Sequence, residues 1–115
     1  MSSQRWRQTA QVVIAADGTG TATIAPTGAG YYRTTFWSVT TSAPPTTGSS
    51  TATIFRNSTG QLDVLEGTYS GDQDTSDTTA ELEPNESLLC VWTGAQPGAT
   101  AVFRVEGRLS PDGSF

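Results

Sequence analysis

The 115-residue chain contains no histidine and no lysine, and it has a single cysteine, Cys90. Without histidine there is no Ser-His-Asp or Cys-His catalytic arrangement and no imidazole ligand for a metal. One cysteine excludes a disulfide within the chain, so packing and hydrogen bonds must supply the stability. Cys90 lies in an apolar stretch with no basic group predicted beside it, so we expect a buried and chemically inert thiol.

Positive charge and long apolar runs are also scarce. Six arginines stand against eleven acidic residues, which gives a formal net charge of −5. An acidic chain lacks the electrostatic footprint of a protein that binds DNA or an anionic membrane. No segment approaches the about 20 apolar residues of a membrane span, and no apolar run of a signal peptide follows residues 1–7. We therefore expect a protein made in a cytoplasm, with neither nucleic acid nor membrane as partner.

Threonine, serine, glycine, valine and aromatic residues dominate the chain, which is a composition typical of strands and turns. Turn signals recur about every 8–12 residues, a spacing that predicts an all-β fold. We expect a single antiparallel β-sandwich of about seven strands, Ig-like or jelly-roll-like. Its domain organisation is predicted as an N-terminal arm over residues 1–8, the sandwich over residues 9–110 and a C-terminal tail over residues 111–115. The predicted strands cover residues 9–16, 21–25, 31–41, 50–57, 62–69, 88–92 and 101–109.

The predicted arrangement centres on residues 87–109. Residues 88–92 are apolar on both faces, which predicts an interior strand covered on both sides. Residues 101–109 alternate, with Ala101, Phe103 and Val105 on one face and Arg104, Glu106 and Arg108 on the other. Gly and Pro in residues 93–98 favour a tight reversal, so the two strands are predicted to form a hairpin. The Asp-Gly turn at residues 17–20 predicts a second hairpin.

Alternation also assigns faces in the other strands. For residues 31–41, one face is predicted to hold Tyr32, Thr34, Phe36 and Ser38, and the other Tyr31, Arg33, Thr35, Trp37 and Val39. Further candidate core positions are Ala52, Ile54, Leu62 and Val64.

The one polar cluster that could carry chemistry begins at residue 71 with GDQDTSD and continues to Glu86. Asp72 and Asp74 are spaced like the opening of a calcium loop, but the required glycine is missing. Aspartates that cap their own backbone are the favoured interpretation. A carboxylate pair such as Asp72 and Glu81 could in principle act as acid and base. Nothing in the sequence places them in a cleft, so we expect no enzyme and no cofactor.

Aromatic side chains leave two alternatives open. Tyr31, Trp37 and Trp92 could form an exposed platform that stacks on a sugar ring, or they could fill the core. Their alternating positions in strands favour the core.

Two segments are candidate interfaces. Arg5, Trp6 and Arg7 either fold back onto the domain or reach a neighbouring subunit, since Trp and Arg are enriched at interface anchors. The loop around Pro44 and Pro45 is predicted to be solvent-facing and suited to contact. The acidic residues 72–86 would then face solvent.

Three segments of the second half share a pattern with a known group of proteins. Residues 67–77, 92–99 and 105–107 read GTYSGDQDTSD, WTGAQPGA and VEG. They follow GT-x-x-G-x-x-D-x-S-D, then W-T-G-x-x-PGA and a last strand ending V-x-G. In this the chain resembles small all-β virion proteins encoded by tailed phages of actinobacteria, which are head decoration or tail accessory components.

The resemblance implies a structural role and assigns no functional residue. We expect a capsid decoration protein on the outer surface of the head, where it stabilises the shell of the virion. Its expected partners are the major capsid protein and other copies of itself, in a homotrimer. The alternative is a carbohydrate-binding or adhesin module of a tail or fibre.

Overall fold

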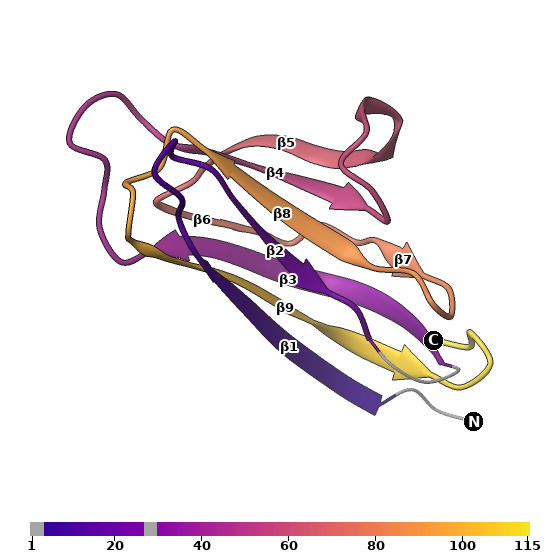
Figure 1. Cartoon of the computed structure of the whole chain (residues 1–115). Helices are drawn as coiled ribbons and strands as arrows, with labels where there is room; N and C mark the ends of the chain where they lie inside the picture. Colours follow the sequence, from indigo (N-terminus) through magenta and orange to yellow (C-terminus); the bar gives the residue numbers. More distant parts are fainter. Residues whose placement is uncertain (1–3, 27–29) are drawn as a thin grey trace.

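The computed structural model describes residues 4–26 and 30–115, without the side chains of 62 and 66–68, and shows nine strands in two antiparallel sheets (Figure 1). The predicted all-β sandwich is confirmed. A single 3-10 turn, η1 (Gln61–Asp63), interrupts the strands of the described chain. None of the described segments is a helix long and apolar enough to cross a membrane.

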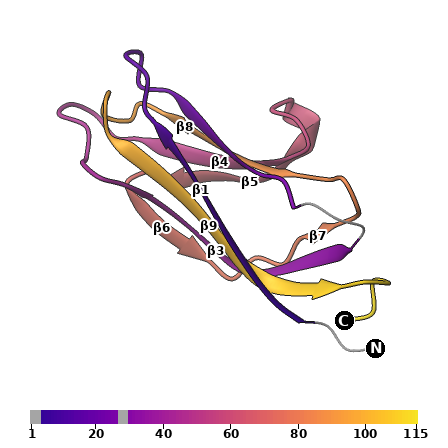
Figure 2. The same ribbon diagram turned by 60° about the horizontal axis from the view of Figure 1, so that its bottom comes forward.

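The two sheets form the two layers seen in Figure 2. Sheet A has the order β1-β9-β3-β6, with β7 also paired to β3, and sheet B has the order β2-β8-β4-β5. The strands of sheet A are β1 (Gln4–Val13), β3 (Tyr31–Thr41), β6 (Gln73–Ser76), β7 (Glu81–Leu82) and β9 (Thr100–Ser110). Those of sheet B are β2 (Gly20–Ile24), β4 (Thr51–Arg56), β5 (Val64–Ser70) and β8 (Leu88–Thr93).

The core lies between the sheets and is built around aromatic residues. Trp37, Trp92 and Phe103 are among its largest fully buried side chains. Each indole also finds an acceptor: Trp37 Nε1 donates to the hydroxyl of Tyr69 at 2.9 Å, and Trp92 Nε1 donates to the carbonyl of Gly71 at 3.0 Å. Buried polar groups are therefore paired as the aromatic surface is removed from water.

The two predicted hairpins are wrong, because in each case the chain passes from one sheet to the other. β8 belongs to sheet B and β9 to sheet A, and β1 and β2 are divided in the same way. The two crossing loops bond to each other, since the backbone N–H of Ala95 donates to the carbonyl of Gly18 at 3.0 Å. Gly18 and Gly94 adopt φ angles of +84° and +68°, which glycine tolerates. The turn signals were correct, but they mark corners between layers.

One face of sheet B is less buried than its sequence predicts. β8 lies between β2 and β4, yet Leu89 and Val91 are half-buried on the outer side of the sheet. Val64, expected in the core, is 41% exposed and pairs with Phe55 on that side. Leu62, the other core candidate of this region, lies outside the described side chains. Apolar residues on both faces therefore do not require protein on both faces here.

A β-bulge in β3 changes the predicted faces of that strand. The register against β9 shifts between Thr34 and Phe36, so the exposed Thr35 is an extra residue. Beyond the bulge Trp37 and Val39 point inward, together with Tyr32 and Thr34 before it. The predicted alternation is correct up to Thr34 and inverted after it.

Segments near both ends of the described chain contact the sandwich. β1 already begins at Gln4, so Gln4–Gln8, expected in an arm, pair with β9. At the other end β9 finishes at Ser110, one residue beyond the predicted strand, and the tail folds back so that the ring of Phe115 lies 4.6 Å from the guanidinium carbon of Arg33.

Candidate functional site

Five of the six arginines lie on the outer face of sheet A. They occupy positions of β1, β9 and β3 whose neighbours along each strand point into the core. We call this surface the arginine face, and it consists of Arg5, Arg7, Arg33, Arg104 and Arg108. The sixth arginine, Arg56, is at the end of β4 in the other sheet.

Charge on this face is opposite in sign to that of the whole chain. Among the outward positions of β1, β9, β3 and β7, Glu106 and Glu81 are the acidic side chains. These positions therefore carry a net charge of +3, while the chain as a whole carries −5. The rest of the chain accordingly carries −8, so the two signs of charge are unevenly distributed over the molecule.

The arrangement places like charges beside each other. Arg5 is opposite Arg108 in the β1–β9 ladder, and Arg108 is opposite Arg33 in the β9–β3 ladder. Directly opposed residues have Cβ atoms about 4.5–5.5 Å apart, and like charges at that spacing are destabilising. The row of three arginines therefore concentrates positive charge on this part of the sheet, and part of the repulsion is offset by the ion pair of Arg33 with Glu81.

Only part of this charge is neutralised within the molecule. Arg33 bonds Glu81 of β7 at 2.8 Å, and Arg104 bonds Glu106. Neither Arg5 nor Arg7 has an ion-pair partner among the side chains that the structure describes. The Nε–H groups of Arg33 and Arg104 are shielded from solvent and also lack an acceptor there. The shielded Nε–H groups cannot reach another molecule, but the exposed guanidinium groups of Arg5 and Arg7 can donate hydrogen bonds to its carboxylate or other anionic groups.

A hollow of about 550 Å³ lies at the end of this face. Its lining residues are Arg5, Trp6, Arg7, Thr35, Glu106, Gly107 and Arg108. Gly107 stands opposite the bulge of β3, and a Cβ on it would lie 2.0 Å from the carbonyl oxygen of Arg33. The bulge and the glycine together bring the strands close, with the exposed Thr35 beside the guanidinium groups.

The structure separates the predicted interface residues. Arg5 and Arg7 belong to the arginine face, whereas Trp6 points to the opposite side of β1 and contacts Tyr32, with ring centroids 4.7 Å apart. The loop with Pro44 and Pro45 lies at the other end of a molecule 50 Å long (Figure 1). The two segments therefore do not form one site.

Three arginines of the face were not singled out from the sequence as site residues. Arg104 and Arg108 share a face of β9 by the alternation that the sequence shows, so their grouping was available. Their position beside Arg5 and Arg33 depends on β9 lying between β1 and β3, a pairing of distant segments that no local signal gives.

The acidic segment forms two short strands at the edge of sheet A. Asp72 Oδ1 accepts hydrogen bonds from Ser50 at 2.8 Å and Thr41 at 3.2 Å, and Asp74 Oδ2 accepts from the backbone N–H of Ser70 at 2.9 Å. The bond of Asp74 agrees with a carboxylate that caps the nearby backbone, whereas Asp72 bonds to side-chain hydroxyl groups of residues distant in the sequence. Within the described residues, no three acidic or cysteine side chains come together as metal ligands.

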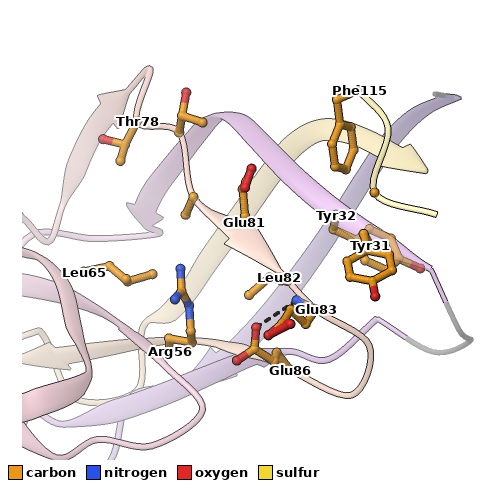
Figure 3. A pocket seen from close by; sticks show the side chains of 13 residues that line it. Tyr31, Tyr32, Arg56, Leu65, Thr78, Glu81, Leu82, Glu83, Glu86 and Phe115 are labelled. Carbon is orange, nitrogen blue, oxygen red and sulfur yellow. Dashed lines mark hydrogen bonds between the residues drawn. The ribbon is translucent and has the colours of Figure 1, made fainter. Parts of the chain in front are cut away.

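Trp37 and Trp92 fill the core, which is the alternative that their alternating positions favour, and form no exposed platform. Trp37 and Trp92 are 1% and 0% exposed, so neither can stack on a sugar. Tyr31 is half-buried and lines a separate groove of about 690 Å³ between the sheets, together with Phe115 and Leu65 (Figure 3). Arg56 points into this groove beside Glu83 and Glu86, and its Nε–H has no acceptor among the described side chains.

Cys90 is fully buried in β8, as expected from the sequence. Desolvation raises the pKa of its thiol far above the ordinary value, so the thiolate is not formed at neutral pH.

Comparison with protein-family models, with curated proteins and with solved structures finds no match to this chain.

Proposed function

We propose that the chain is a non-enzymatic structural protein of a tailed-phage virion, a decoration protein that binds the outer surface of the head through its arginine face. The observation that carries this proposal is the segregation of charge: five arginines on one sheet face of an acidic protein. A broad charged face is suited to docking on a protein surface of the opposite sign. The similarity of residues 67–107 to small virion proteins supports the same role.

The proposed partner is the major capsid protein, which offers many equivalent positions on a shell. Each contact through exposed arginines is weak, because exposed ion pairs contribute only about 0.2–1 kcal/mol. Copies that also bind each other, such as the expected trimer, would gain avidity on a symmetric lattice. A small stable sandwich without an active site is sufficient for this purpose.

Purified heads that lack the protein provide the test. We expect saturable co-sedimentation that weakens as salt is raised, because screening acts on exposed charges. The variant Arg5→Gln/Arg7→Gln removes two charges that have no ion pair within the described side chains, and we expect about tenfold weaker binding from the loss of two contacts.

Arg56→Gln is the control for net charge and is compared with Arg5→Gln alone, since each removes one charge and Arg56 lies in the other sheet. We expect its binding to stay within about twofold of the unmodified protein. If Arg56→Gln weakens binding as much as changes in the arginine face, net charge alone would explain the effect and the docking surface would be wrong. Retention on the tail with bare heads would instead favour the adhesin alternative.

A further inference from the structure

β1 is a long edge strand with one side open. It is the outermost strand of sheet A and pairs with β9 over ten consecutive residues without a register shift (Figure 1). On its other side, no strand of the described chain pairs with it. A regular edge of this length presents a row of unpaired backbone groups to any second chain.

The direction of these groups can be read from the end of the strand. Ile14 donates its N–H to the carbonyl of Ala99 at 2.9 Å, so the groups of Ile14 face β9. The carbonyl of Thr100, which is opposite Val13, accepts instead from Ser42 on the far side of β9. Because direction alternates along a strand, the odd-numbered residues of β1 direct their N–H and C=O to the open edge.

Other edges of the sandwich are less suited to pairing. β6 and β7 have four and two residues, β2 has five, and the β4–β5 ladder shifts register twice. Short or irregular strands are the usual protection of a sheet edge. β1 has neither a bulge in its ladder nor a proline.

The sequence of β1 is complementary to itself around Thr9. In an antiparallel pair of two β1 strands centred there, Arg5 is opposite Val13 and Arg7 is opposite Gln11. No arginine then opposes another in the new ladder. Val13, which is 65% exposed and the most exposed large apolar side chain described, would be covered by the methylene groups of Arg5. On the inner side, the half-buried Trp6 and Val12 would pair.

We propose that two copies of this chain associate through β1, with a two-fold axis at Thr9, and thereby join their sheets into one continuous sheet of ten strands. This inference does not depend on docking to a head. It goes beyond the proposed function because it identifies a surface for self-association, replaces the expected trimer by a two-fold dimer and makes the two arginine faces a single one.

The mass in solution tests the pairing. Sedimentation equilibrium should give about twice the chain mass of 12.1 kDa. Thr9→Pro removes an N–H that faces the open edge, so we expect this variant to be monomeric. Its melting temperature should equal that of the unmodified protein diluted until it is monomeric. Thr9→Val keeps the N–H and should remain dimeric. A monomeric unmodified protein, or a trimer that Thr9→Pro leaves intact, would overturn the proposal.

The register is tested by charge at position 11. In this register the side chain at position 11 stands opposite Arg7 of the second copy, and the contact occurs twice. Gln11→Glu would attract that arginine, and Gln11→Arg would repel it. We expect the dimer dissociation constant to fall about fivefold for Gln11→Glu and to rise about fivefold for Gln11→Arg. Both variants leave the inward side of β1 unchanged, so folding should not be affected. Equal dissociation constants for the two would exclude this register.

Discussion

Replacing Gly107 with alanine is expected to lower the free energy of unfolding by about 3 kcal/mol or more, because the added Cβ has no space. It would lie 2.0 Å from the carbonyl oxygen of Arg33 and 2.8 Å from the Cα of Thr34. Both are backbone atoms of the neighbouring strand, which cannot move aside as a flexible side chain would. The two central strands of sheet A must separate at the bulge.

Denaturant unfolding of Gly107→Ala measures this cost, with the slope of the transition checked for two-state behaviour. Gly60→Ala serves as the control. Gly60 has an extended conformation that alanine adopts readily, and its Cβ would approach nothing closer than 3.4 Å. Its stability should be unchanged or slightly raised. If Gly107→Ala is as stable as Gly60→Ala, the close approach of β9 to the bulge is incorrect.

Thr34→Val is expected to cost about 2–3 kcal/mol through the loss of one buried hydroxyl. Thr34 is 0% exposed, and its Oγ1 donates to the carbonyl of Thr78 at 2.9 Å and accepts from the N–H of Ala80 at 2.8 Å. Valine has nearly the same shape but leaves the buried N–H of Ala80 without that acceptor. The hydroxyl thus holds the segment between β6 and β7 against β3.

The same unfolding measurement distinguishes this effect from a general change in strand preference. Thr40→Val is the matched substitution in β3, at an outward position opposite Val102 of β9. We expect it to change the free energy of unfolding by less than about 0.5 kcal/mol. Equal costs for the two variants would mean that the hydroxyl of Thr34 is not used as described.

Local signals in the sequence predicted the strands better than their partners. β3 runs over Tyr31–Thr41, the range that its β-branched and aromatic residues indicate, and β9 differs from the predicted strand by one residue at each end. The connection at residues 94–99, which leads from β8 in sheet B to β9 in sheet A, contains the Gly and Pro residues that are also typical of a hairpin turn. Only the packing of two layers decides whether such a turn pairs its flanking strands or separates them, so the predicted hairpins could not be checked locally.

The faces of β3 show a second limit of pattern analysis. A bulge changes the side on which every later residue lies, and nothing in the letters of residues 31–41 marks Thr35 as the extra one. The residue that indicates the bulge is in β9, where Gly107 provides no side chain within an otherwise well-packed strand. The acidic residues were predicted as a loop for a similar reason: β6 and β7 are short strands held by pairing with β3 and not by their own propensity.

The arginine face could be predicted only in part. The alternation in β9 groups Arg104 with Arg108, but the neighbouring Arg5, Arg7 and Arg33 come from segments about 70 to 100 residues away. Composition shows an acidic chain and thereby argues against a basic surface. The net charge is only a sum, and it does not show that five of the six arginines lie on one face of sheet A.

The position of β9 between β1 and β3 also determines how this protein can fold. Sheet A has no centre until residues 100–110 are present, because β9 pairs with both β3 and β1, and β1 is made about 90 residues earlier. When strands distant in the sequence pair, the chain loses the entropy of closing a long loop before the stabilising contacts form. We therefore expect slow folding, on a timescale of about milliseconds to seconds. During synthesis β1 has no partner in sheet A until β9 has been made, so Val12, Ile14 and Trp6 remain exposed to solvent until then.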